Sequence, residues 1–207
     1  MISATESGGS AADESEMRWL TPCLVVVCFT ACMKTVDVSH DIQPSRPNPS
    51  KSSEKAGVVC SERLLAGVAR ASQYRLELGE PLCNALLRTV EGSYRSAQRA
   101  TKPYAGEFGR VVQFDLQSRS LDIQRRGDGS TRVACSITVV VERYGRDLKR
   151  TSRQAVSGNG FVERRDATDA IVREAAETAL QQVADNASSL LVAGLDGPRV
   201  QASPPSP

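Results

Sequence analysis

The clearest pattern in this chain is a set of five apolar residues at strict period two over residues 133–141, with a mostly polar opposite face. A period of two predicts a strand that buries one face and exposes the other. Before it, the apolar positions of residues 112–116 and 121–123 fall on opposite parities, which predicts a long strand with a bulge near Ser118. The apolar residues are Val112, Phe114, Leu116, Leu121, Ile123, Val133, Cys135, Ile137, Val139 and Val141.

Two turns connect these segments. Gly127-Asp128-Gly129 predicts a hairpin turn between the first two strands. Residues 144–147 predict a second turn, which leads into a mainly polar strand over residues 148–156. Its cations suit an exposed sheet edge, because charge discourages edge-to-edge pairing. We therefore expect a three-strand antiparallel meander, with an edge protected by Lys149, Arg150 and Arg153.

Two helices are expected beside the meander. The first begins at Pro81, which suits a first helical position. The second has Asp166 as its N-cap and ends at Gly194. Alanines in the second apolar stripe would let that helix lie close to a sheet. The two stripes are Leu82, Leu86, Val90, Tyr94 and Ala97 in the first helix, and Ile171, Ala175, Ala179, Val183, Ala187 and Leu190 in the second.

Short strands are also predicted over residues 58–60 and 74–78. The fold class is therefore α+β, a mainly antiparallel sheet with two helices packed on one face. We expect one such domain over residues 57–194. Residues 32–56 are expected to form a lipidated N-terminus and a Pro- and Ser-rich tether, because they hold few large apolar side chains. Residues 195–207 have a similar composition and are expected to be a disordered tail.

Residues 17–31 have the layout of a secretory signal: Arg18, a short apolar centre, and small residues before a cysteine. The run is shorter than the roughly 18 apolar residues that a membrane-spanning helix needs. Phe29-Thr30-Ala31-Cys32 resembles the lipobox of bacterial lipoproteins, which usually have Leu at the position of Phe29. The resemblance implies that Cys32 carries a diacylglycerol. An uncleaved membrane anchor and a buried core segment are the alternatives.

Residues 1–16 do not fit the start of such a signal. They carry four acidic residues and no Lys or Arg, whereas the leading region of a signal is positive. We expect translation to start at Met17 and residues 1–16 to be a mis-assigned extension.

The residue after the lipidated cysteine indicates the membrane. Met33, not Asp, follows Cys32. In bacteria resembling enterics, this sends a lipoprotein to the outer membrane, facing the periplasm, rather than retaining it at the inner membrane.

The charge of the chain is mildly basic. The formal net charge is +2, and it becomes +5 without residues 1–31, which hold four acids and one base. An Arg-rich surface suits anionic lipid, lipopolysaccharide or an acidic partner, and the alternative is an ordinary solvated surface. Nucleic acid is not expected as a partner, since the chain is expected to leave the cytoplasm.

Three cysteines remain outside the signal and the lipidation site. Cys135 lies on the apolar face of the best-defined strand, so we expect it in the core. Disulfides form in an oxidising periplasm, and Cys60 with Cys83 is the expected pair. None of the spacings resembles a metal-binding motif.

The residues that could carry chemistry do not form a recognisable catalytic pattern. His40, the only histidine, falls in the expected tether, where nothing would hold it against a nucleophile. Gly158-Asn159-Gly160 lacks the features of a phosphate loop and is interpreted as a turn. We expect no enzymatic activity, no metal and no cofactor. The carboxylates considered, which show no recognisable pairing, are Asp115, Asp122, Glu142 and Asp147.

The order strand, helix, meander, helix over about residues 57–192 resembles two families of small envelope lipoproteins. These are the lipopolysaccharide-assembly lipoproteins and the YajG-type lipoproteins. No functional residue carries over from this architectural resemblance. We expect a non-catalytic, membrane-anchored scaffold or assembly accessory that binds a protein partner through its sheet edge or an Arg-rich face, because an edge strand offers unpaired backbone groups. The alternatives are a protein that binds a lipid or small ligand between helices and sheet, and an enzyme that uses carboxylates.

Overall fold

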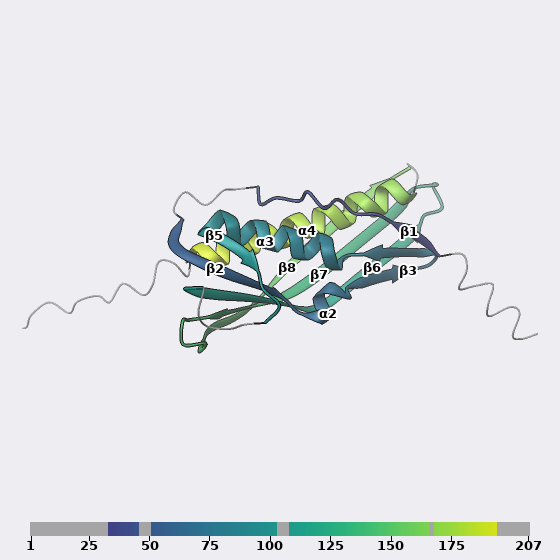
Figure 1. The fold of residues 1–207 in the computed structure, drawn as a ribbon. Coiled ribbons are helices and arrows are strands. Elements are labelled where there is room, and N and C mark those ends of the chain that lie inside the picture. Colours follow the sequence, from purple (N-terminus) through teal and green to yellow (C-terminus); the bar gives the residue numbers. More distant parts are fainter. Residues whose placement is uncertain (1–32, 46–50, 103–107, 166–167, 194–207) are drawn as a thin grey trace, which may run out of the picture. The chain divides into compact units, whose positions relative to one another are not determined.

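The computed structural model describes residues 33–45, 51–102, 108–165 and 168–193. From Lys34 onward they belong to one compact unit, in which the two long helices lie over one face of a twisted sheet (Figure 1). The strands form a five-stranded sheet in the order β5-β2-β6-β7-β8 and a three-stranded sheet in the order β1-β4-β3. The larger sheet contains β2 (Ser52–Cys60), β5 (Tyr94–Arg99), β6 (Arg110–Arg125), β7 (Thr131–Tyr144) and β8 (Arg150–Arg164).

The smaller elements complete the unit. The second sheet contains β1 (Lys34–Val36), β3 (Val68–Ala71) and β4 (Tyr74–Glu77). The helices are α2 (Glu62–Leu65), α3 (Gly79–Ser93) and α4 (Thr168–Ala193). Their apolar faces and the inner face of the five-stranded sheet enclose one main hydrophobic core.

The meander is confirmed. Strands β6, β7 and β8 pair antiparallel in sequence order. The predicted bulge is at Gln117, because Leu116 pairs with Val139 and Ser118 with the next residue, Thr138. In the first hairpin Gly129 has φ +83°, in the region that favours glycine. The extra residue at the bulge places the two apolar parities of β6 on the same face of the sheet.

The sheets are mixed rather than mainly antiparallel, although the α+β class is correct. Strand β2 runs parallel to both β5 and β6, and β1 runs parallel to β4. The chain leaves β2, passes through α3 and returns as β5. A helical crossover of this kind joins neighbouring parallel strands.

The first long helix is shorter than predicted. It covers Gly79–Ser93, and Tyr94 and Ala97 lie in β5 instead of on the helical stripe. Two local features end the helix at this point. Gly92 and Ser93 are weak helix formers, and the Ser93 hydroxyl donates to the Thr89 carbonyl oxygen within the last turn. Tyr94 then favours an extended backbone.

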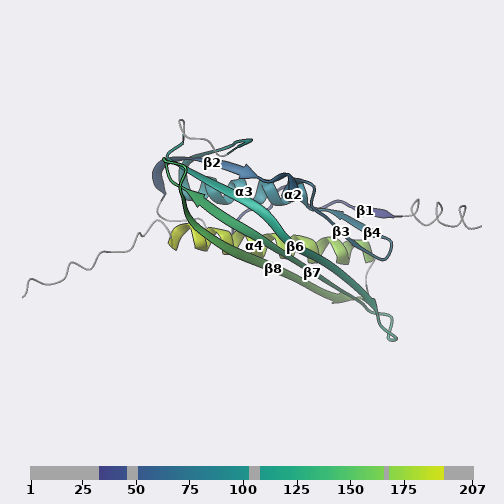
Figure 2. The same cartoon turned by 90° about the horizontal axis from the view of Figure 1, so that it is seen from below.

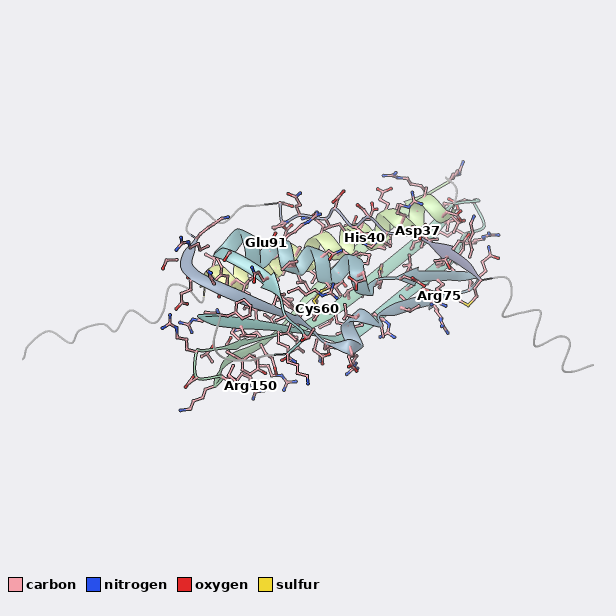
Figure 3. The ribbon with its side chains drawn as sticks, viewed as in Figure 1. Asp37, His40, Cys60, Arg75, Glu91 and Arg150 are labelled. Atoms are coloured by element: carbon pink, nitrogen blue, oxygen red, sulfur yellow. A yellow bond between two sulfur atoms is a disulfide. The ribbon has the colours of Figure 1, made fainter. Side chains whose placement is uncertain are left out.

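The expected tether is wrong for the described part of residues 32–56. Lys34–Val36 and Ser52–Cys60 are strands, and residues 37–45, called the belt from here on, run along α4 with Val38 and Ile42 buried. Figure 3 shows Asp37 and His40 on this belt. Side chains of the two long helices hold it: Glu177 and Asp185 accept from the backbone N–H groups of Ser39 and Ser45, Arg173 and Gln181 donate to the carbonyl oxygens of Asp37 and Gln43, and Arg88 pairs with Asp41.

Backbone contact between α4 and β8 joins the second long helix to the sheet. Gly158-Asn159-Gly160, expected to be a turn, lies inside β8. A Cβ atom on Gly158 would lie 2.0 Å from the Ala179 carbonyl oxygen, and one on Gly160 would lie 1.7 Å from that of Ala175. The two glycines are therefore a groove in the sheet that receives the alanine stripe of α4.

Replacing Gly160 with Ala tests this contact. We expect Gly160→Ala to lower the free energy of unfolding by about 3 kcal/mol, because the added methyl group forces α4 away from the sheet. Gly127→Ala is the matched control, since a Cβ there meets nothing within 4 Å. Urea unfolding of the purified proteins would measure both. A Gly160→Ala protein as stable as the parent would contradict the contact.

Candidate binding surface

The predicted lipidation site lies just before the described part of the domain. Cys32, the signal over residues 17–31 and residues 1–16 all fall outside the described residues. Lys34 begins β1, two residues after Cys32; its backbone N–H donates to the Gln73 carbonyl oxygen, and its ammonium pairs with Asp169 at the start of α4. No helix among the described residues has the length and apolar character that crossing a bilayer requires.

Cys60 and Cys83 are joined by a disulfide, with their Cα atoms 6.0 Å apart. This is the pair that the sequence analysis favoured. The bond links the end of β2 to the first turns of α3, and both residues are buried. The disulfide therefore links the crossover helix α3 to β2, the strand from which the crossover begins.

Cys135 is a free thiol on the buried face of β7. Burial raises its pKa from the ordinary 9.0 to about 11, because the apolar core disfavours the thiolate. A buried thiol with a raised pKa is a poor nucleophile and a poor metal ligand, so it acts as a small core side chain.

The carboxylates considered as catalytic candidates accept hydrogen bonds from separate neighbours. Asp115 accepts from the Ser61 hydroxyl at 2.5 Å, Asp122 from Gln124 at 2.7 Å, and Asp147 from the backbone N–H of Lys149 at 3.2 Å. His40 is exposed on the belt. Among residues 33–45, 51–102, 108–165 and 168–193, no three His, Cys, Asp or Glu side chains gather closely enough to hold a metal ion.

The edge strand β8 is closed in its middle by α4. The Gln182 amide oxygen accepts from the backbone N–H of Asn159 at 2.6 Å, and the Asn186 amide nitrogen donates to the Ser157 carbonyl oxygen at 2.7 Å. These side chains satisfy backbone groups that an added strand would need. Strand β8 is an edge strand of the sheet, as the sequence predicted. Besides its cations, the side-chain amides of Gln182 and Asn186 protect this edge.

The turn between β7 and β8 carries a concentration of positive charge, and residues 142–153 are called the basic hairpin from here on. Glu142 lies at its base and accepts from the Tyr144 hydroxyl at 2.6 Å, from Arg150 at 3.1 Å and from Arg153 at 3.2 Å. The hydrogen bond to the Glu142 carboxylate raises the pKa of Tyr144, because it stabilises the protonated phenol. Five cations outnumber two acids: Arg143, Arg146, Lys149, Arg150 and Arg153 against Glu142 and Asp147.

Two large apolar side chains are exposed on the described part of the chain. Phe161, 53% exposed, lies on the face of β8 away from the helices, and the Arg132 guanidinium stacks on its ring at 4.8 Å. Leu148, 38% exposed, lies at the tip of the basic hairpin. The sequence analysis identified the surrounding cations as edge protection but missed Leu148, whose signal is an apolar residue within a charged turn.

Comparison with known proteins places the fold. No family model matches the chain, and no curated protein matches its sequence. The crystal structure of protein XCC0632 from Xanthomonas campestris, of family DUF330, matches with a TM-score of 0.56 and 15% identity, over 78% of this chain and 97% of that one. The chain therefore has the same fold as XCC0632.

Two further solved structures are similar at lower scores. A Caulobacter crescentus protein named a "putative lipoprotein" matches with a TM-score of 0.42 and 11% identity, over 69% of this chain and 90% of that one. A minor lipoprotein from Acinetobacter baumannii matches with a TM-score of 0.39 and 9% identity, over 70% of this chain and 96% of that one.

Removing the disulfide should weaken the fold measurably. The bond closes a loop across a sequence separation of 23 residues, and the loss of such a constraint costs about 3 kcal/mol in the chain-entropy account. We expect the Cys60→Ser, Cys83→Ser double variant to lose about this much free energy of unfolding in urea. The parent protein treated with reductant should lose a similar amount. An unchanged midpoint in both would mean that the bond does not constrain the chain.

The buried thiol predicts a loss of stability at high pH. The folded pKa of Cys135 is raised above the unfolded value, so its contribution is complete below pH 9 and falls as the pH rises toward about 11. Two pKa units correspond to roughly 2 to 3 kcal/mol. Between pH 7.5 and pH 10.5, which is still below the folded pKa, the parent should lose about 2 kcal/mol more unfolding free energy than Cys135→Ala. Parallel losses in the two proteins would refute the assignment.

Proposed function

We propose that this chain is a non-catalytic envelope lipoprotein, anchored by a lipid on Cys32 and acting by binding a protein partner. The lipobox-like segment before Cys32 supports the anchor. The Cys60–Cys83 disulfide supports an oxidising compartment, such as the periplasm. The outer membrane is the proposed location because Met33 follows Cys32, with the inner membrane as the alternative.

The short connection between Cys32 and β1 determines which end of the domain would lie next to the membrane. Consecutive Cα atoms are 3.8 Å apart, so a lipid on Cys32 would hold the Lys34 Cα within about 8 Å of the modified residue. Lys34 in turn is fixed to Asp169 and to the β3–β4 turn. We call this the β1 end of the sheet. The domain would therefore stand directly on the bilayer, since the belt that follows is held against α4.

The basic hairpin is the proposed contact surface for the partner. It lies at the opposite end of β7 from the β1 end, and fourteen residues of strand separate the two by roughly 45 Å (Figure 2). The cationic side chains of its ion pairs are 52% to 85% exposed, so they remain accessible to an acidic surface. A domain held at the β1 end would thus present the hairpin away from its own membrane.

The alternative of a ligand between helices and sheet has less support. The α4 backbone meets Gly158 and Gly160 so closely that even a methyl group would clash. A shallow depression of about 590 Å³ does lie beside α4, lined in part by Asp41, Glu177 and Asp185. These carboxylates already hold the belt, through Arg88 and two backbone N–H groups. The depression is therefore better explained as the boundary between the belt and α4 than as a ligand site.

The anchor is tested by replacing the lipidated cysteine. In cells fed radiolabelled palmitate, Cys32→Ser should carry no label and should move from the membrane to the soluble fraction, because the thioether cannot form. Cys28→Ser, within the signal, is the matched control and should keep both label and membrane association. Density-gradient separation of the two membranes would then assign the location. A label that persists on Cys32→Ser would remove the basis of the proposal.

Partner binding is tested separately. Affinity purification of the lipidated protein from crosslinked envelopes should recover one membrane protein at a stoichiometric level. The same purification from cells that express Cys32→Ser should recover much less, because the soluble protein no longer stands beside the membrane partner. Recovery of no partner by the parent protein would contradict a binding function.

A further inference from the structure

We propose that Leu148 is the apolar contact residue of the basic hairpin, and that it enters an apolar pocket on an acidic surface of the protein partner. This inference rests on the proposed function, because it assumes that a protein partner exists. It adds the chemistry of that partner and the residue that determines binding.

The backbone at Leu148 is the first observation. Its φ is +57°, in the left-handed region that a leucine rarely adopts. The loop is closed by hydrogen bonds from Gly145 N–H to the Lys149 carbonyl oxygen and from Leu148 N–H to the Gly145 carbonyl oxygen, both 3.0 Å. Hairpin loops of this length usually place glycine at a left-handed position, because it has no Cβ. Leucine here is therefore less favourable for the fold than glycine would be.

The exposure of Leu148 is the second observation. The side chain is 38% exposed and is not part of the hydrophobic clusters formed by the described residues. Phe161, which is more exposed, has the Arg132 guanidinium stacked on its ring. Core packing thus does not account for a leucine at this position. Strained residues that the fold itself does not require gather at functional sites.

The charges around Leu148 indicate the kind of partner. Arg146, two residues earlier, has no ion pair among the described residues, and the Lys149 ammonium lies 3.7 Å from the exposed carboxylate of Asp147. Arg150 and Arg153 share the single carboxylate of Glu142. An apolar side chain surrounded by cations complements an apolar pocket with an acidic rim, the usual arrangement of a binding hot spot within a polar border.

The position of the hairpin favours a protein over the anchoring membrane. Figure 2 shows the β7–β8 turn at the end of the sheet opposite β1. If Cys32 holds the β1 end at the bilayer, Leu148 lies beyond the other end of β7, a strand of fourteen residues that spans roughly 45 Å. A cationic tip with one leucine could also bind anionic lipid, so binding to vesicles is treated as a competing outcome.

Leu148→Gly separates a binding role from a structural role. Glycine relieves the left-handed backbone, so we expect the melting temperature to rise by about 3 °C. The same variant should lose at least about tenfold of its affinity for the partner, a typical effect of removing a central apolar contact. Leu148→Met keeps an apolar side chain and should retain binding. Phe161→Ala, on a different surface, should leave binding unchanged.

The measurement uses the full lipidated proteins, immobilised in mild detergent and titrated with envelope extract from cells that lack the protein. The parent and Leu148→Met should retain one protein stoichiometrically, and this retention should weaken as salt rises from 0.15 to 0.5 M. Equal retention by Leu148→Gly, or a fall in its melting temperature, would overturn the inference while leaving the proposed function intact. Retention of no protein by the parent would overturn both.

A vesicle assay decides the competing outcome. The full-length Cys32→Ser protein, which lacks the anchor, is mixed with vesicles of phosphatidylglycerol and phosphatidylethanolamine. We expect no binding that depends on Leu148. Binding that Leu148→Gly abolishes would identify the hairpin as a membrane contact and would overturn the proposal of a protein pocket.

Discussion

Backbone contact between α4 and β8 is the constraint on which the rest of this structure depends. Gly158 and Gly160 leave no room for a side chain, so the alanine stripe of α4 lies directly on the strand. With the helix fixed there, Gln182 and Asn186 reach the edge of β8 and close it. The outer side of α4 also holds the belt, and its first turn holds Lys34. One close contact therefore fixes the sheet edge, the belt and the point at which the chain enters the domain.

Elements with a local signal were predicted well, and elements that depend on distant partners were not. Alternation and turn chemistry located the meander, its bulge at Gln117 and the hairpin at Gly129. The belt has little apolar character, and side chains of helices far along the chain hold it, such as Arg88 of α3 and Glu177 of α4. Gly158-Asn159-Gly160 has the composition of a turn, but it pairs with β7 as part of β8, and α4 packs on its two glycines. Parallel pairing of β2 likewise follows from the path of the chain, which periodicity does not encode.

The candidate binding surface was predicted only in part, because some of its features have a local signal in the sequence and others do not. The cations of the third strand are visible in the sequence, and the structure places them at one end of β7 with Glu142 among them. Leu148 became notable only with its positive φ and its exposure, two properties that composition does not reveal. Cys60 and Cys83 were paired correctly because few cysteines remained to choose from. The domain therefore has β1 at one end and the basic hairpin, with its exposed leucine, at the other.

The orientation of the domain on the bilayer is the central claim, and energy transfer to the membrane surface measures it most directly. Cys135 is buried and Cys60 is bonded to Cys83, so a single cysteine introduced at Asp128 or at Asp147 can be labelled selectively. The lipidated proteins are placed in vesicles that carry an acceptor on their lipid headgroups. Strong transfer from position 128, beside the β1 end, and weak transfer from position 147, roughly 45 Å along the strands, is the predicted result. Equal transfer from the two positions, or stronger transfer from position 147, would contradict the account.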